Sequence, residues 1–538
     1  MSSGHAADGS EFDVVVVGFG AAGACAAIEA ADAGARVLVL DRFDGGGASE
    51  RSGGSVYAGG GTETQVAAGF ADDPDRMLRY LQAETGGAVG EEVLRAFCEE
   101  SRENLHWLRS HGLDFEGGFF GHKTTHPPNG YALYYSGNEP QREGTGSAPR
   151  GHVPAAVGMS GRVLFQALAR AARDRGVEVR THSQATRLVT DGGAVTGVEV
   201  LALRDHPLLH GAHRLLFGLG SLSRPVGPLI RAFEQAGGRT YRVRARAVVI
   251  AAGGFVFHRG MVARHARPYA SCMPLGTPGD DGASIRLGQG VGAALTRMDE
   301  CAAWRFIYPP EAFVSGLMVN LRGERFCDES LYGATLCRHI ARQPDARAYL
   351  VIDARVERLV LEQLATEERI RDHSLRKILS GELNALIFRK YSAVLNLRVN
   401  RRAARSVGAL ERRCGLPAGS LQRAVDAYNQ RLARGEPDEQ GKADRYRVPL
   451  TEPPFRAINC DLGNQLFLGP CITLGGLKTD GLTAAVLRED GAPVPGLFAA
   501  GRSAAGICAG GYVSGLSLAD CVFSGRRAGR GAAGRRGC

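Results

Sequence analysis

Short apolar runs recur along this chain, three of them followed directly by glycine, and they predict the strands of a buried sheet. The runs are Val14–Val17, Val37–Leu40, Ala247–Ala252 and Pro495–Ala500. A continuous apolar run without polar alternation is typical of a parallel strand that is covered on both faces. Because the runs come from both ends of the chain, we expect one sheet that is assembled from both termini.

Patterns with helical spacing separate these strands. Apolar residues recur at that spacing over 74–110, 161–175 and 515–529. Between 255 and 455 the sequence predicts helices at 332–343, 357–366 and 419–434, and strands at 294–298, 317–320 and 348–352. The stretch 117–150 is rich in Gly, Pro, His and Tyr and predicts irregular loops. The alternation of strands and helices indicates an α/β fold.

One segment, 206–237, fits neither pattern. It mixes many Leu and Phe residues with Arg214, Arg224 and Arg231, and Gly and Pro interrupt it. The apolar residues are too many for a solvated loop, and the breaks are too many for one long helix. Two interpretations stay open. The segment is either a lid or membrane-surface element, with its arginines at lipid phosphates, or an elaboration of the core.

A glycine turn follows the first strand, with the spacing G-x-G-x-x-G over 18–23. Gly18 permits the tight turn, Gly20 lets a pyrophosphate approach the backbone, and Gly23 lets the next helix pack close to the strand. The N-terminus of that helix offers unpaired N–H groups to phosphates. Asp41 ends the second strand, where a carboxylate accepts hydrogen bonds from a ribose diol. The stretch therefore predicts a dinucleotide site.

Composition narrows the function classes. The chain has 538 residues, of which 44% are hydrophobic and 22% charged, as expected for a globular protein of two or more domains. The formal charge of +9 comes from scattered arginines, and no nucleic-acid-binding motif accompanies them. Twelve cysteines show no CxxC pair and no metal-ligand spacing, which favours reduced thiols and no metal site. We find no signal peptide and no run of membrane-spanning length, so we expect a cytoplasmic protein.

Three motifs together resemble a known family. Residues 12–54, 246–254 and 495–529 resemble the FAD-binding framework of the fumarate reductase and succinate dehydrogenase flavoprotein superfamily. Within it the chain is most similar to 3-ketosteroid dehydrogenases of the Δ4-(5α) type, and next to the Δ1 type. The sequences ERFCDESLY at 324–332 and YVSGLSLAD at 512–520 carry this similarity.

The resemblance implies a discontinuous, Rossmann-like FAD-binding domain with an inserted α+β substrate (capping) domain. We place the FAD-binding domain at 10–270 and 455–531 and the insert at 271–454, with flexible tails at 1–9 and 532–538. The FAD-binding domain then includes the apolar insertion 206–237. No His or Cys stands in a recognisable flavin-attachment motif, so we expect non-covalent FAD.

The motifs and the resemblance define the expected site residues. The expected FAD contacts are Gly18, Gly20, Ala21, Ala22, Gly23, Asp41, Arg42, Ser49, Ser52, Gly53, Gly54, Ala185, Ala252, Gly253, Gly254, Asp281, Gly501, Arg502, Gly515, Ser517 and Leu518. In the ketosteroid branch, a Tyr-x-Ser beside the flavin and a second Tyr from the insert form the active site. Tyr512 with Ser514 matches the first element, and Tyr332 matches the second.

The chain departs from the fumarate reductases at two positions. Those enzymes carry a His-Pro-Thr element and an arginine proton donor in the insert. Here Tyr308 replaces the histidine, and the arginine position falls near Tyr332. Both changes remove cations that would hold a dicarboxylate, which argues against fumarate or succinate as the substrate. Tyr308 thereby joins the expected catalytic residues.

Desaturation beside a ketone requires a donor that polarises the carbonyl, a base for the α proton, and a hydride acceptor at about 3–3.5 Å from the β carbon. FAD N5 would be the acceptor. A tyrosine with a pKa of about 10 is a poor base at neutral pH, whereas a Tyr–Ser relay requires less perturbation. Which hydroxyl is the base stays open. The N-terminus of the closing helix would stabilise negative charge on the flavin.

The expected reaction is therefore desaturation of an apolar 3-ketosteroid-like ketone. Two alternatives remain: a flavin enzyme that oxidises or reduces a non-steroidal enone, and a flavoprotein that only binds FAD. We find no second nucleotide fingerprint for NAD(P)H and no iron–sulfur cysteine pattern. A diffusible, quinone-like electron acceptor is the default, and 206–237 is the candidate for a peripheral membrane contact.

Overall fold

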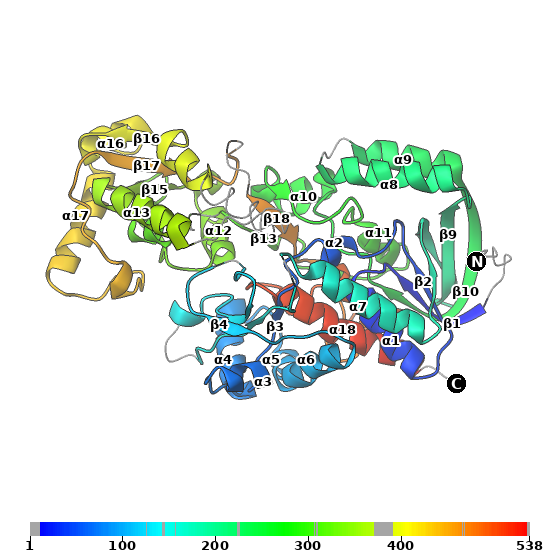
Figure 1. Ribbon diagram of the computed structural model, residues 1–538. Coiled ribbons are helices and arrows are strands. Elements are labelled where there is room, and N and C mark those ends of the chain that lie inside the picture. Colours follow the sequence, from blue (N-terminus) through cyan, green and yellow to red (C-terminus); the bar gives the residue numbers. More distant parts are fainter. Residues whose placement is uncertain are drawn as a thin grey trace.

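The computed structural model describes residues 11–124, 126–141, 146–156, 158–222, 226–305, 307, 310–370, 391–464, 466 and 469–534. Its largest sheet contains β1 (Glu11–Val17), β2 (Val37–Leu40), β7 (Glu178–Arg180), β8 (Ser183–Asp191), β9 (Ala194–Leu203), β10 (Gly238–Ile250), β20 (Ala485–Leu487) and β21 (Pro493–Ala499). The order is β20-β21-β10-β1-β2-β7, and β9 pairs with β10 and β8 (Figure 1). β1, β2, β10 and β21 pair in parallel, which confirms one sheet built from both termini.

The two faces of β1 pack against different layers. Val14 and Val16 share a core with α1 (Ala21–Asp32), α7 (Gly161–Asp174) and α18 (Leu516–Ala533). Val15 and Val17 share the opposite core with residues of β8, β9 and α11 (Ala283–Gln289). Because successive strand side chains point to opposite faces, a continuous apolar run is required to fill both cores.

Residues 47–152 add a second group of short elements, of which α3, α5 and α6 lie below α18 in Figure 1. They are α2 (Gly47–Glu50), β3 (Val56–Tyr57), α3 (Glu63–Ala67), α4 (Pro74–Thr85), α5 (Glu91–Glu99), α6 (Ser101–Ser110), β4 (Gly118–Phe120), β5 (Tyr131–Tyr134) and β6 (Gly151–His152). The four strands form one sheet in the order β3-β6-β5-β4. The prediction of irregular loops over 117–150 is therefore wrong for β4 and β5, which are too short to show a period of two.

The insert contains a separate four-stranded antiparallel sheet. Its elements are β14 (Leu317–Val319), α12 (Gly333–Ala341), β15 (Tyr349–Ile352), α13 (Ala354–Ile370), β16 (Arg401–Ala404), α16 (Val407–Cys414), α17 (Ser420–Ala433) and β17 (Phe455–Asn459), with strand order β14-β15-β17-β16. β17 lies beyond the expected boundary at 454, and Leu287 and Leu295 pack with the nucleotide-binding sheet although they lie within 271–454. The expected boundaries at 270 and 454 stay predictions.

Short elements connect the two halves. They are α10 (Arg259–His265), β11 (Met273–Pro274), β12 (Leu295–Thr296), β13 (Cys301–Ala303), β18 (Pro470–Thr473) and β19 (Gly476–Leu477). β11, β18 and β13 form one small sheet, and β12 pairs with β19. The predicted strand at 294–298 thus shortens to two residues.

The segment 206–237 folds into a helical hairpin, α8 (Pro207–Leu222) and α9 (Val226–Gly237). The prediction that it cannot form one long helix is confirmed. Figure 1 shows the hairpin at the upper right, above α11, whereas α12 and α13 lie farther to the left. Within the described residues, no helix is both long and apolar enough to span a bilayer.

Candidate active site and cofactor cleft

A cleft opens where β1, β2 and β10 end and α1 begins. Among the expected FAD contacts, it is lined by Gly18, Gly20, Ala21, Ala22, Asp41, Arg42, Ser49, Ala185, Ala252, Gly253 and Arg502. The cleft encloses about 910 Å³ of space between protein atoms, a volume that includes solvent at its open side. The structure therefore brings residues from four distant parts of the sequence into one site.

Each of the three glycines of the turn is required for a different structural reason. Gly18 has a φ of +101°, and a Cβ there would lie 2.5 Å from the carbonyl oxygen of Ala251. A Cβ on Gly23 would lie 1.9 Å from the carbonyl oxygen of Gly18, so helix and strand pack in direct contact. At Gly20 a Cβ would meet the Ser49 hydroxyl at 3.4 Å and the carbonyl oxygen of Gly46 at 3.7 Å, both ordinary contact distances, and the position lines the cleft. Gly20 thus keeps space free for a group that binds there, as a pyrophosphate requires.

Asp41 ties the glycine turn to the loop after β2. Its carboxylate accepts hydrogen bonds from the backbone N–H of Phe19 (2.8 Å), Phe43 (2.8 Å) and Gly45 (3.3 Å). Burial raises the pKa of this carboxyl, and the three N–H groups oppose that rise. Since an ionised carboxylate offers about four lone-pair sites, acceptor capacity remains for a ribose diol.

Asp280, which the sequence analysis did not select, organises the opposite wall. It lines the cleft and accepts hydrogen bonds from the backbone N–H of Gly254 (3.1 Å) and from Arg502 (2.7 Å). Its neighbour Asp281 lies outside the cleft lining and pairs with Arg42 at 3.0 Å. Two adjacent aspartates cannot be distinguished by sequence, because only the backbone direction decides which one faces the cleft.

The other expected FAD contacts do not line this cleft. They are Gly23, Ser52, Gly53, Gly54, Gly254, Asp281, Gly501, Gly515, Ser517 and Leu518. Several are sites of close packing: a Cβ on Gly54 would lie 2.4 Å from the backbone of Ser160, and one on Gly515 would lie 2.8 Å from the amide nitrogen of Tyr57. Gly515 also begins α18 with a φ of +85°. These residues shape the path of the chain around the cleft.

A cluster of hydroxyl groups lies where the insert meets the nucleotide-binding half. The Tyr134 hydroxyl donates a hydrogen bond to the Ser514 hydroxyl at 2.9 Å. The Tyr332 hydroxyl accepts one from the Trp304 indole N–H at 2.9 Å, and the Trp304 ring packs edge-on against Tyr512 at 5.1 Å. The structure thus brings Tyr512, Ser514 and Tyr332 together. Tyr308 lies outside the described residues.

Burial determines the ionisation of these phenols. It raises the pKa of Tyr134 to about 12, against the hydrogen bonds that Tyr134 donates to Ser514 and Ser55, which lower it. Burial also raises the pKa of Tyr332 and, further, that of Tyr512, each with a neighbouring phenol adding to the rise. All three are therefore neutral phenols at neutral pH, so a proton can leave one only in concert with a relay.

Sequence reasoning did not select Tyr134 or Trp304 as catalytic residues. Tyr134 lies on β5, in the stretch expected to be irregular, and its complete burial is seen only in the structure. A backbone contact holds Ser514 close to this strand, because the N–H of Ser514 donates a hydrogen bond to the carbonyl oxygen of Ser136 at 2.9 Å. The clustering of Tyr131, Tyr134 and Tyr135 is the signal that could have indicated a site.

Tyr332 is held from both sides of the domain junction. It precedes α12, and its backbone N–H donates to the Asn138 side-chain oxygen at 2.5 Å. The Asn138 amide in turn donates to Glu84 and to Thr335, and all of these groups are buried. Because Asn138 belongs to the nucleotide-binding half, Tyr332 is oriented by contacts that cross the junction.

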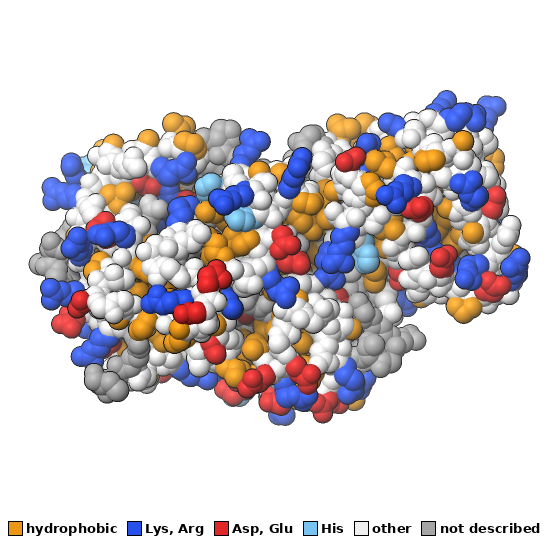
Figure 2. All heavy atoms as spheres, turned by 180° about the vertical axis from the view of Figure 1, so that it is seen from behind, with side chains coloured by type: hydrophobic (Ala, Val, Ile, Leu, Met, Phe, Trp, Pro, Cys, Tyr) orange, Lys and Arg blue, Asp and Glu red, His pale blue; other side chains and the backbone are white. Residues whose placement is uncertain are grey.

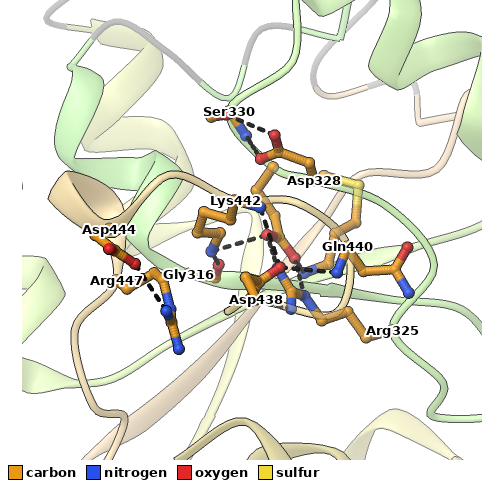
Figure 3. Close-up of polar contacts among 11 residues, drawn as sticks. Gly316, Arg325, Asp328, Ser330, Asp438, Gln440, Lys442, Asp444 and Arg447 are labelled. Carbon is orange, nitrogen blue, oxygen red and sulfur yellow. Dashed lines mark hydrogen bonds and ion pairs between the residues drawn. The ribbon is translucent and has the colours of Figure 1, made fainter. Parts of the chain in front are cut away.

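A buried ionic network anchors the segment that leads to Tyr332. Glu329 pairs with Lys442 and with Arg325, each at 2.8 Å, and Arg325 also pairs with Asp438 at 2.7 Å. Figure 3 shows Lys442, Arg325 and Asp438 pointing toward one another. Burial would raise the pKa of Glu329, but Lys442 and Arg325 lower it, so the carboxylate is charged. Breaking one partner of such a buried network strongly destabilises its segment.

Comparison with known proteins adds the family. Residues 13–515 match the family described as an FAD binding domain. The chain belongs to this family. It is an FAD-dependent oxidoreductase that acts on CH–CH groups, and the open position at Gly20 beside the N-terminus of α1 fits the pyrophosphate of FAD. When bound, FAD supplies the hydride acceptor.

Three relatives of this flavoprotein are informative. It is 35% identical to the 3-oxo-5-alpha-steroid 4-dehydrogenase of Comamonas testosteroni, over 91% of this chain and 92% of that protein. It is 25% identical to the probable fumarate reductase Ifc3 of Shewanella frigidimarina, over 97% of this chain and 74% of that protein. The crystal structure of the 3-ketosteroid-delta4-(5alpha)-dehydrogenase from Rhodococcus jostii RHA1, in complex with 4-androstene-3,17-dione, matches with a TM-score of 0.78 and 34% identity, over 97% of both chains.

Proposed function

We propose that this flavoprotein desaturates a 3-ketosteroid-like ring ketone by removing an α proton and transferring a hydride to FAD. The observation that carries the proposal is the buried cluster of Tyr512, Ser514, Tyr332 and Tyr134 at the domain junction. Neutral hydroxyls polarise a ketone without placing a full charge beside an apolar substrate. The relative with 35% identity, a 3-oxo-5-alpha-steroid 4-dehydrogenase, supports this substrate class.

The hydroxyls divide into two groups by their contacts. Ser514 accepts from Tyr134 and lies within hydrogen-bonding reach of Tyr332, so it can pass a proton between two phenols. Tyr512 packs against Trp304 through its ring, which leaves its hydroxyl to face a substrate. In this scheme Tyr512 polarises the carbonyl. Tyr332 takes the α proton while its own proton passes through Ser514 to Tyr134, and Tyr134 passes one proton on to the Ser55 hydroxyl, 3.0 Å away, for release from the protein. Concerted transfer along the relay avoids a full phenolate, whose formation burial opposes.

FAD is proposed to bind without a covalent bond. Among the cleft-lining residues, Cys521 is the one with a nucleophilic sulfur. Burial raises the pKa of its thiol to about 12, so the reactive thiolate is scarce at neutral pH. Acid or heat denaturation should therefore release yellow flavin from the polypeptide.

A diffusible, quinone-like molecule is the proposed electron acceptor, and a peripheral membrane contact would bring the enzyme close to it. The outward face of the hairpin carries Leu208, Leu215, Leu219 and Leu229, which are 46–77% exposed. Figure 2 shows hydrophobic side chains with arginine or lysine nearby along the upper left edge, where α8 and α9 lie in that view. Apolar residues beside cations suit the headgroup zone of a bilayer. Sedimentation with anionic liposomes would test this contact.

Anaerobic flavin bleaching tests the reaction. The holoenzyme is mixed with a saturated 5α-3-ketosteroid, its Δ4-unsaturated counterpart, a saturated monocyclic ketone, and succinate. We expect rapid loss of the yellow absorbance with the saturated ketosteroid, and product with a new double bond by mass spectrometry. Bleaching by the monocyclic ketone alone would favour a non-steroidal substrate. Bleaching by succinate, or by none of the four, would contradict the proposal.

A further inference from the structure

The hairpin α8–α9 forms one wall of the FAD cleft, although it is an insertion between two strands. Phe217 of α8 lines the cleft together with Asp41, Arg42 and Phe43. These three residues follow β2, at the strand end where a dinucleotide-binding fold holds the ribose and the adenine. We propose that the hairpin is a clamp on the adenosine half of FAD and that Phe217 contacts the cofactor directly.

Aromatic contacts attach the clamp to the loop after β2. The rings of Phe217 and Phe43 lie 4.4 Å apart, and His213, one turn earlier on α8, stacks on Phe43 at 5.0 Å. The Arg51 guanidinium lies 4.6 Å from the centre of the Phe217 ring. Phe217 is therefore held in position at the cleft, and its ring offers an apolar surface that suits an adenine.

Ion pairs attach the clamp to the same loop. Arg42 binds both carboxylate oxygens of Glu234 on α9, at 2.7 and 2.8 Å. Glu234 also pairs with His213 at 3.0 Å, and Arg214 on α8 pairs with Asp44 at 2.9 Å. Glu234 and His213 are buried, so the Arg42–Glu234 pair is sheltered from solvent. Both helices are thus tied to residues 42–44, which directly follow the expected ribose ligand Asp41.

The hairpin is separable from the sheet beneath it. It leaves the sheet after Leu203 and returns at Gly238, and these two residues pair in the antiparallel β9–β10 ladder. The backbone N–H of Arg204 also donates to the carbonyl of Gly237 at 3.3 Å. Because the ladder closes below the hairpin, the sheet does not need the hairpin to be complete. Completing the sheet therefore does not explain the hairpin, and its attachment to residues 42–44 points to a function at the cofactor cleft.

The clamp has a specific consequence for cofactor exchange. With the hairpin in place, FAD leaves the cleft only after the contacts to residues 42–44 open, so dissociation is slow. Contact of one base with one aromatic ring is typically worth a factor of about ten or more in affinity. Phe217→Ala should therefore raise the Kd for FAD about tenfold and accelerate its release. This inference does not depend on the substrate.

The experiment measures FAD affinity and release instead of turnover. Phe217→Ala, Glu234→Gln and the control Leu215→Ala are compared with the wild type. Leu215 is on the same helix but faces solvent, with 65% of its surface exposed. Apoprotein is titrated with FAD, and flavin fluorescence after dilution gives the dissociation rate. A fourth variant replaces 204–237 with Asn-Gly, which closes a two-residue hairpin.

We expect faster release and weaker binding in Phe217→Ala and Glu234→Gln, wild-type values in Leu215→Ala, and the fastest release in the shortened protein. Wild-type Kd and release rates in both Phe217→Ala and Glu234→Gln would overturn the clamp. Circular dichroism reports whether each apoprotein is folded. If the shortened protein does not fold, the two point variants decide the question, since each removes one side chain from a folded hairpin.

Discussion

The Tyr134 hydroxyl donates a hydrogen bond to the Ser514 hydroxyl at 2.9 Å, across 380 residues of sequence. Tyr134 is also 3.0 Å from the Ser55 hydroxyl, so its oxygen lies between two serines. The arrangement extends the predicted Tyr-x-Ser element by one phenol. It gives Ser514 a partner on the side away from Tyr332, as a proton relay requires.

Tyr134→Phe should lower kcat by about 10² while FAD binding is kept, because the ring still packs and only the relay hydroxyl is lost. Turnover with a saturated 5α-3-ketosteroid and the flavin content of the purified protein are the measurements. Tyr131→Phe is the matched control, since Tyr131 is on the same strand and is 40% exposed. Equal activity of the two variants would exclude Tyr134 from the relay.

Tyr512→Phe should retain FAD and lose turnover by about 10²–10⁴, the usual contribution of one general acid or base. The phenyl ring preserves the edge-on contact with Trp304, so folding should be unaffected. Rates of anaerobic flavin reduction separate the chemical step from product release. Retention of more than about half of the wild-type rate would show that the carbonyl is polarised elsewhere.

Gly20→Val and Gly23→Ala should fail in different ways. At Gly20 the nearest atom to a Cβ is the Ser49 hydroxyl oxygen at 3.4 Å, so the fold tolerates the side chain while the pyrophosphate space is filled. We expect a folded, flavin-free protein. At Gly23 a Cβ would lie 1.9 Å from the Gly18 carbonyl, so we expect misfolding. Flavin absorbance and circular dichroism distinguish the outcomes, and normal flavin content in Gly20→Val would contradict the assigned pyrophosphate site.

Glu139 should make stability depend on pH. Burial raises the pKa of its carboxyl from 4.5 to about 7, although the backbone N–H of Gly137 donates to it at 2.7 Å. A raised folded-state pKa stabilises the fold below pH 4.5, and this stabilisation is lost as the pH rises through about 7. A shift of this size corresponds to at most about 3 kcal/mol.

The variant Glu139→Gln should not lose this stability as the pH rises, because its side-chain amide keeps the contact to Gly137 and does not ionise. Denaturant unfolding at pH 5 and pH 8 measures the difference, which should be smaller in Glu139→Gln than in the wild type. The exposed Glu116→Gln is the control and should behave like the wild type. An identical pH dependence in all three proteins would show that Glu139 is not the responsible group.

Much of the nucleotide-binding half could be predicted because its determinants are local. The turn at 18–23 and the acid at Asp41 follow one another within a single strand–helix–strand unit, and their spacing alone requires the tight approach that the structure shows. The strands of the insert near 317 and 348 were found for the same reason: each is an apolar run with its own turn signals. Short strands such as β4 and β5 were not predicted, because they are defined by the strands they pair with and not by a pattern in their own sequence.

The sequence by itself determined a dinucleotide site, since the glycines and Asp41 act through neighbours a few residues away, and the resemblance of three motifs to a flavoprotein family made that dinucleotide FAD. Only the tertiary structure decided which hydroxyls meet, because Tyr134, Tyr332 and Ser514 come from three segments that share no local pattern. It also decided the place of 206–237. The composition of that segment fits a lid, a membrane element or a core elaboration equally well, and the ion pair between Arg42 and Glu234, 192 positions apart, puts it at the cofactor cleft. Contacts over such distances depend on how the chain returns to its own sheet, which no local spacing encodes.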